Sequence, residues 1–168
     1  MSRRTNKKVI KLFMQVIFIL LIAFVLSVKE EDAKFIVKLE SCVDGDTAKF
    51  VTDEGIKTVR FLAIDTPETV HPTIEEEPFG KEASTFTCTE LTNANTIILE
   101  LDSDSDKYDK YDRLLVWVFV DDILLQDRLI DKGYAKTAYL YGDYKYTDLL
   151  LQSEEEAKAE QRGIWYNE

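Results

Sequence analysis

The sequence is short of positive charge. Its 168 residues include 21 Lys and Arg but 32 Asp and Glu, so the formal net charge is −11. Residues 1–28 contain five basic residues and no acidic one, so the rest of the chain has 16 basic residues against 32 acidic ones and a net charge of −16. This excess of acid excludes binding to a polyanion through a broad basic surface. It leaves open a nucleic acid held by a few placed cations.

Cysteine and histidine are also scarce, with two cysteines, Cys42 and Cys88, and a single histidine, His71. Because no CxxC motif or Cys/His spacing is present, the sequence does not predict a zinc site. The two cysteines either form one disulfide or remain buried thiols, and both alternatives stay open. His71 precedes a proline in a predicted loop, so we expect it to be structural rather than a catalytic base.

A long apolar run lies near the N-terminus. It extends from Leu12 to Val28, follows several basic residues, and gives way abruptly to an acidic stretch. This pattern is typical of an export signal, although no clear small-x-small cleavage site is present. We therefore expect a cleaved signal peptide or a retained signal-anchor helix over residues 1–28, and a short acidic linker over residues 29–34. A retained anchor would hold the protein to the membrane through residues 12–28.

Residues 35–166 are expected to form one domain, since they contain short strands early and helices later and no internal repeat. The strands are predicted over 35–42, 47–52, 56–64, 96–101 and 114–120. The helices are predicted over 81–91, 125–132 and 148–162, the last two followed by Gly133 and Gly163. This order predicts an α+β fold built on a small β-barrel.

Three short segments contain the candidate chemistry. Asp44-Gly45-Asp46-Thr47 is a turn that can point a carboxylate at a cation, although Asp and Gly also suit any hairpin turn. The segment Arg60 to Glu68 combines a guanidinium with the carboxylates of Asp65 and Glu68, which suits a phosphoester site or a partly buried ion pair. Asp109 to Arg113 adds a second guanidinium at the start of a strand, where a solvated turn is the alternative.

Together these segments resemble the staphylococcal nuclease family. Asp44 to Thr47, Arg60, Asp65 to Glu68 and Asp109 to Arg113 are similar to family motifs, in the family's order. The resemblance extends to the segments His71-Pro72, Phe79 to Ser84, Ala135 to Tyr141 and Gly163 to Trp165, and so covers roughly residues 35–166. Each motif is weak alone, but their combined order and spacing are specific.

The resemblance implies a five-stranded OB-type barrel with three helices and Ca²⁺-dependent hydrolysis of DNA and RNA. It implies cleavage of the 5′ P–O bond, leaving 3′-phosphates. By this resemblance Asp46, Asp65 and the carbonyl of Thr66 would hold Ca²⁺. The remaining roles that it implies are general base for Glu68, phosphate binding for Arg60 and Arg113, contact with a neighbouring phosphate for Lys110 and Tyr111, and the nucleotide pocket for Tyr139 and Tyr141. We expect a monomer that is secreted or anchored outside the cytoplasm.

Two features depart from the resemblance. Asp112 stands where the family usually has glycine, and we expect it either to weaken substrate binding or to pair with Arg113. The acidic segment 102–106 has the first acids of an EF-hand loop but lacks its glycine and its final Glu, so we expect a solvated loop. The alternatives to a nuclease are a non-catalytic nucleic-acid-binding module on the same fold and an OB-type module for another ligand.

Overall fold

The computed structural model describes residues 13–17, 33–69 and 77–166. The chain divides into two units, residues 1–31 and 32–168. In the first unit residues 13–17 are helical and exposed. The rest of the predicted signal or anchor, most of the linker and the His71-Pro72 loop lie outside the described residues. Within the described part of the chain, no helix has the length and apolar character needed to cross a membrane.

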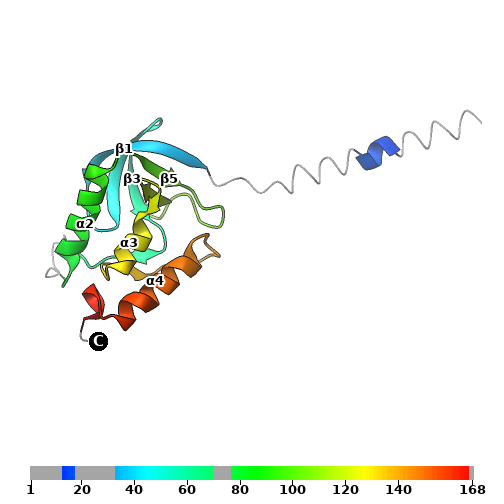
Figure 1. The fold of residues 1–168 in the computed structure, drawn as a ribbon. Coiled ribbons are helices and arrows are strands. Elements are labelled where there is room, and N and C mark those ends of the chain that lie inside the picture. The colour runs from blue at the N-terminus through cyan, green and yellow to red at the C-terminus, as the bar shows by residue number, and fades with distance from the viewer. Residues whose placement is uncertain (1–12, 18–32, 70–76, 167–168) are drawn as a thin grey trace, which may run out of the picture. The chain divides into compact units, whose positions relative to one another are not determined.

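The second unit is built on a closed five-stranded barrel (Figure 1). Each of its strands pairs antiparallel with its neighbours, except that β3 and β6 run parallel and close the barrel. The strands are β1 (Lys34–Cys42), β2 (Thr47–Thr52), β3 (Gly55–Phe61), β5 (Ile97–Glu100) and β6 (Leu114–Val120). The prediction of an α+β fold with an OB-type barrel is therefore confirmed.

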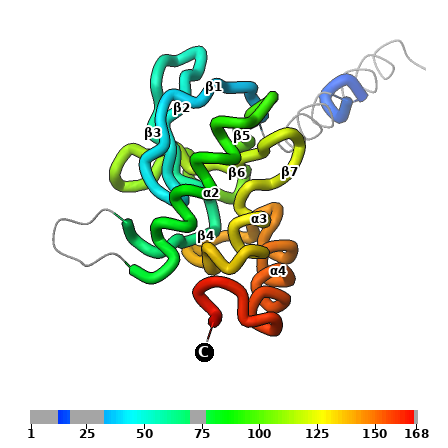
Figure 2. Tube along the Cα trace, turned by 60° about the vertical axis from the view of Figure 1, so that its left-hand side comes forward, coloured from blue at the N-terminus to red at the C-terminus, as the bar shows by residue number. Residues whose placement is uncertain are grey.

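The predicted strand over residues 56–64 is interrupted, and this prediction was wrong. Strand β3 ends at Phe61, and Ala63 has a positive φ of 62°. The chain then leaves the barrel to form β4 (Ile64–Asp65), which pairs with β8 (Lys136–Thr137). In Figure 2 β4 lies below β3, on the side of the helices. Because residues 59–64 are all buried, their apolar pattern gave no sign of the turn.

The three predicted helices are present. They are α2 (Gly80–Asn93), α3 (Leu125–Asp131) and α4 (Thr147–Ala159), and α3 follows the short strand β7 (Ile123–Leu124). Helix α3 packs against both β6 and α4. Helix α4 ends earlier than predicted, and a 3₁₀ turn, η1 (Gly163–Trp165), follows it.

Two glycines fix η1 against the end of α3. Gly133 has a φ of 68°, and a Cβ added to it would lie 2.1 Å from the backbone oxygen of Arg162. A Cβ added to Gly163, whose φ is 56°, would lie 2.0 Å from the backbone oxygen of Gly133. The backbone N–H of Ile164 donates to that same oxygen at 2.8 Å. Only glycine permits this approach of two backbones.

The barrel core explains part of the acidic segment 102–106. Trp117 is fully buried, and its indole N–H donates to Asp102 at 2.8 Å. Asp102 is itself buried and also accepts the backbone N–H groups of Asp104 and Lys145. The prediction of a solvated loop was therefore wrong for its first residue, because Asp102 satisfies a core tryptophan.

Cys42 and Cys88 form a disulfide that joins the end of β1 to α2. Their Cα atoms are 5.6 Å apart, within the usual range for a disulfide. Beside it, the Thr87 hydroxyl donates to the backbone oxygen of Gly45 at 2.6 Å. The turn that carries Asp46 is therefore attached to α2 by one covalent bond and one hydrogen bond.

We expect the double substitution Cys42→Ser/Cys88→Ser to lower the free energy of unfolding by about 4 kcal/mol, because the disulfide closes a long loop in the unfolded chain. Urea unfolding of the oxidised wild type and the variant measures the difference. Reduced wild type serves as the control and should unfold with the variant. Equal stability of the variant and the oxidised wild type would contradict this account.

Candidate active site

Asp46 and Arg60 form a buried ion pair between the turn before β2 and strand β3. Asp46 precedes β2, and Arg60 lies in β3 opposite Thr47, the first residue of β2. Arg60 Nη2 is 3.0 Å from Asp46 Oδ2, and both residues are less than a tenth exposed. The hydroxyl of Thr47 donates to Asp46 Oδ1 at 2.9 Å. Burial raises the pKa of the Asp46 carboxyl, while the charge of Arg60 opposes that shift.

Asp65 contacts the same guanidinium. Its Oδ1 lies 3.3 Å from Arg60 Nη2 and accepts the Tyr139 hydroxyl at 3.4 Å. The Arg60 guanidinium also lies 5.5 Å from the centre of the Tyr139 ring. The charge of Asp65 raises the pKa of Tyr139, so its hydroxyl stays protonated at neutral pH. Asp46 and Asp65 thus direct one oxygen each at a single cationic nitrogen.

Thr66 attaches the following loop to Asp46. Its backbone N–H and its hydroxyl both donate to Asp46 Oδ2, at 3.1 and 3.2 Å. The Cα of Gly45 faces the Thr66 side chain so closely that an added Cβ would lie 2.7 Å from the Thr66 hydroxyl oxygen. This close approach explains glycine in the middle of the Asp44 to Thr47 turn.

Glu68 lies on the same loop and is exposed. Its backbone N–H donates to the Glu77 carboxylate at 3.1 Å, and its carbonyl accepts the Glu77 N–H at 3.1 Å. The neighbouring Thr69 hydroxyl donates to Asp44 at 2.7 Å. The backbone of Glu68 is therefore fixed on both sides, while its side chain lies at the surface.

The second guanidinium lies in the turn before β6. Arg113 Nε is 2.6 Å from Asp109 Oδ2, and Asp109 Oδ1 accepts the backbone N–H groups of Tyr111 and Arg113 at 2.9 Å. Burial opposes ionisation of Asp109, but the hydrogen bonds from Arg113 and Tyr111 outweigh it and lower its pKa. Because β3 and β6 are neighbours and Arg60 pairs with Leu115, Arg113 lies two residues before the position opposite Arg60.

Asp112 has a backbone φ of 61°, which explains why glycine suits this position. Aspartate is one of the few other residues that tolerate such a conformation. Of the two expectations for Asp112, pairing with Arg113 is not what the structure has, since the ion pair described for Arg113 is with Asp109. Whether Asp112 weakens substrate binding stays a prediction.

The predicted substrate-binding residues are exposed. Tyr111 is 67% exposed, and the ammonium of Lys110 lies 4.9 Å from its ring centre. Tyr139 and Tyr141 are also exposed, with ring centres 6.2 Å apart. Elsewhere in the tyrosine-rich run, Tyr144 is buried and Tyr146 packs against Trp117, as core packing predicts.

The predicted residues therefore fall into two groups. Contacts among Asp46, Arg60, Asp65, Thr66 and Tyr139 join the first group, with Tyr141 beside Tyr139 and Glu68 on the adjoining loop. Lys110, Tyr111 and Arg113 form the second group, on the neighbouring turn. The described contacts join members within each group, and the parallel β3–β6 pairing places the start of β6, which follows the second group, beside Arg60 near the end of β3.

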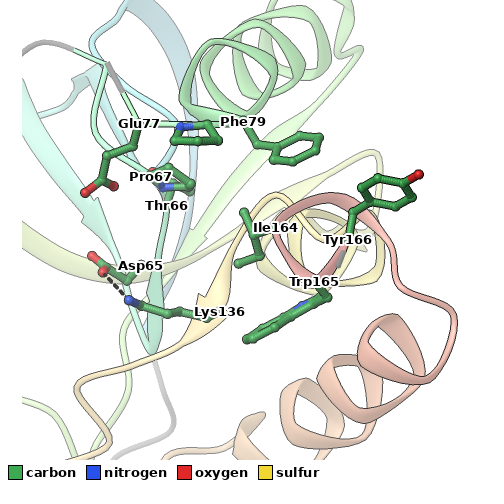
Figure 3. A pocket seen from close by; sticks show the side chains of 10 residues that line it. Asp65, Thr66, Pro67, Glu77, Phe79, Lys136, Ile164, Trp165 and Tyr166 are labelled. Carbon is green, nitrogen blue, oxygen red and sulfur yellow. Dashed lines mark ion pairs between the residues drawn. The ribbon is translucent and has the colours of Figure 1, made fainter. Parts of the chain in front are cut away.

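Lys136 belongs to this site, although sequence reasoning did not assign it there. It lies opposite Asp65 in the β4–β8 pair, and its ammonium is 3.6 Å from Asp65 Oδ2 (Figure 3). The available signal was its place in the Ala135 to Tyr141 segment, three residues before Tyr139. Two-residue strands leave no periodic pattern, so the pairing itself could not be read from the sequence.

The donor set suits a hard cation better than a zinc ion. Asp46 and Asp65 supply carboxylate oxygens that converge on one position, and Thr66 supplies a backbone carbonyl nearby in sequence. Ca²⁺ prefers oxygen ligands and tolerates irregular geometry. No group of three or more His, Cys, Asp or Glu arranged to hold a metal occurs among residues 13–17, 33–69 and 77–166.

The protein is therefore an OB-type barrel with two arginines near strand ends, each in an ion pair with aspartate. Residues 58–167 match the family model described as staphylococcal nuclease homologue. This protein therefore belongs to the staphylococcal nuclease family.

Individual relatives are similar over most of this chain. It is 43% identical to the SPbeta prophage-derived endonuclease YokF and 41% identical to the endonuclease YncB, both of Bacillus subtilis. Each match covers 77% of this chain, but 43% of YokF and 61% of YncB, so the chain spans about half the length of these relatives. It is also 33% identical to the thermonuclease of Staphylococcus hyicus, over 77% of this chain and 75% of that protein.

We expect Asp109→Asn to lower the free energy of unfolding at neutral pH by about 1–3 kcal/mol, because it weakens charged hydrogen bonds to the Arg113 turn. A carboxyl with a lowered pKa stabilises the fold above its unfolded pKa of about 3.9, and this stabilisation is lost as the pH falls through the folded pKa. Urea unfolding between pH 7 and pH 2 should therefore show the difference shrinking below about pH 4.

The matched control is Asp112→Asn, at an exposed residue of the same turn, which should change stability by less than about 0.5 kcal/mol. A difference between wild type and Asp109→Asn that persists unchanged at pH 2 would refute the proposed role of the Asp109 charge.

Proposed function

We propose that this protein is a Ca²⁺-dependent nuclease that acts outside the cytoplasm and hydrolyses phosphodiester bonds of DNA and RNA. We further propose that it cleaves the 5′ P–O bond and leaves 3′-phosphates. The observation that carries the proposal is the convergence of Asp46 and Asp65 on Arg60, beside the loop that presents Glu68. The endonucleases and the thermonuclease among its relatives support it.

The two arginines would bind the phosphate. A phosphodiester under attack by water gathers negative charge on its non-bridging oxygens, and fixed guanidinium groups aimed there lower the barrier. The planar fork of arginine matches two phosphate oxygens better than lysine does. Arg60 is held by Asp46, Asp65 and the backbone oxygen of Phe61, to which its Nη1 donates at 2.7 Å. Arg113 is held by Asp109.

Asp46, Asp65 and the carbonyl of Thr66 would hold the Ca²⁺. When bound, this ion supplies positive charge that polarises the phosphate and offsets the charge formed during attack. In the structure Arg60 balances both carboxylates. With a cation bound to the same carboxylates, the Arg60 guanidinium would therefore be available to bind phosphate oxygens. The hydrogen bonds from Thr47 and Thr66 keep Asp46 oriented throughout.

Glu68 would take the proton from the attacking water. An exposed carboxylate on a backbone fixed by Glu77 can reach solvent while staying beside Thr66. Lys110 and Tyr111 would contact the next phosphate, and the exposed rings of Tyr139 and Tyr141 would contact the nucleotide. Stacking of bases on aromatic rings tolerates any sequence, which suits a nuclease without base preference.

The location outside the cytoplasm is also a proposal. The basic and apolar pattern of residues 1–28 supports export, with attachment to the membrane through residues 12–28 if that segment is retained. The Cys42–Cys88 disulfide supports it independently, since disulfides persist mainly in oxidising compartments. We propose that the protein acts as a monomer.

The test is digestion of single-stranded DNA with Ca²⁺, with EDTA, and by the variant Glu68→Gln. We expect cleavage that needs Ca²⁺ and falls by roughly 10²–10⁴ in Glu68→Gln, because a general base is lost while the fold and binding groups remain. The matched control is Glu40→Gln, at an exposed glutamate of β1, which should cleave at the wild-type rate.

Three outcomes are informative. Cleavage by Glu68→Gln at the wild-type rate, or cleavage that survives EDTA, would refute the mechanism. Binding of DNA without cleavage by the wild type would indicate a non-catalytic nucleic-acid-binding module. If the wild type neither binds nor cleaves DNA, the result would favour an OB-type module for another ligand.

A further inference from the structure

Asp65 and Lys136 line one side of a pocket of about 480 Å³ (Figure 3). We call it the Trp165 pocket and define it by Asp65, Lys136, Phe79, Trp165 and Tyr166, together with Pro67 and Glu77. Its volume is within the range of small-molecule sites. The roles proposed above for the site residues give this space no occupant.

Asp65 forms the boundary between the pocket and the site. Its Oδ1 contacts Arg60 and Tyr139, while its Oδ2 contacts Lys136. Asp65, Thr66 and Lys136 line the pocket, whereas Arg60 and Tyr139 do not. A nucleic acid strand with its phosphate at Arg60 would therefore have one nucleotide beside the tyrosines. The pocket beyond Asp65 leaves room for a second nucleotide.

The chemistry of the pocket suits a base rather than a phosphate. Phe79, Trp165 and Tyr166 supply aromatic surface, and Figure 3 shows Trp165 and Ile164 across the pocket from Pro67. The one ammonium, Lys136, is paired with Asp65, and Glu77 adds a negative charge. A phosphate would be repelled, whereas a flat base would stack on the rings and donate a ring N–H, such as that of thymine, to a carboxylate.

The aromatic wall is held in place before any ligand binds. Gly133 and Gly163 fix η1 against α3, and the backbone N–H of Trp165 donates to Arg162 at 3.1 Å. The ammonium of Lys158 in α4 lies 4.7 Å from the centre of the Trp165 ring. A site that is already ordered loses less entropy when its ligand binds.

We propose that the Trp165 pocket binds the base of the nucleotide next to the one at Tyr139 and Tyr141. The enzyme would then contact a single strand on both sides of the scissile phosphate. This inference rests on the proposed nuclease function. It makes the aromatic residues at the C-terminal end of the fold part of substrate binding.

The test compares two ligands in Ca²⁺, using the full chain with Glu68→Gln to prevent cleavage. Thymidine 3′,5′-bisphosphate offers one base, and a thymidine dinucleotide offers two. We expect the second base to strengthen binding roughly ten-fold, within the range for stacking on aromatic side chains. Adding Tyr166→Ala should abolish this gain without weakening the bisphosphate, and Tyr166→Phe should retain it. Tyr166 is 66% exposed, so these variants should fold normally.

Tryptophan fluorescence gives a second measurement. The chain has two tryptophans, and Trp117 is fully buried, so a change caused by the dinucleotide but not the bisphosphate reports Trp165. Equal binding of the dinucleotide by Tyr166→Ala and its parent would overturn the inference and leave the nuclease proposal intact, and so would equal weakening of both ligands. Failure of the wild type to cleave DNA, together with no binding of either ligand, would overturn both proposals.

Discussion

The buried guanidinium of Arg60 is the constraint on which the site depends. A buried arginine is tolerated only when its charge is balanced and its N–H groups are satisfied, and removing one partner of such a pair typically costs about 3–5 kcal/mol. Asp46, Asp65 and the Phe61 carbonyl meet this requirement. Asp65 can do so because the chain turns out of the barrel after Phe61, and this turn brings Asp65 back to Arg60 in β3. The disulfide and Thr87 hold the opposite turn, which carries Asp46.

The acidity of the chain is consistent with this design. The net charge of −16 on residues 29–168 repels a nucleic acid substrate at long range. Under the proposed function, binding then depends on short-range groups: two arginines, a cation on two carboxylates, and exposed tyrosines. The Trp165 pocket would extend the same principle, since stacking of a base needs no positive field. Under that proposal, the affinity for nucleic acid would fall only slightly with added salt, because few phosphates are neutralised.

The barrel and the helices could be predicted because their sequence patterns are local. Strand β6 is a continuous apolar run whose predicted bounds match the structure, and glycines follow the ends of α3 and α4. The candidate site residues came from motif order, which indicated Asp46, Arg60 and Asp65 without showing that they meet. The features that the sequence did not predict are contacts between distant residues. One is the β4–β8 pair that places Lys136, and the other is the hydrogen bond to Asp102 from a tryptophan 15 residues away. The positive φ of Asp112 depends on its turn, and a single sequence does not show it.

The most direct test of the central claim is the kcat/KM of Arg60→Lys on single-stranded DNA in Ca²⁺. Lysine keeps the positive charge but lacks the planar guanidinium that contacts both carboxylates and that, under the proposed function, would bind two phosphate oxygens. The account predicts a fall of roughly 10²–10³, the usual cost of removing a group that stabilises the transition state. Arg128→Lys, in the ion pair that Arg128 of α3 makes with Glu90 of α2, is the matched control and should retain activity. Wild-type kcat/KM in a folded Arg60→Lys would contradict the account.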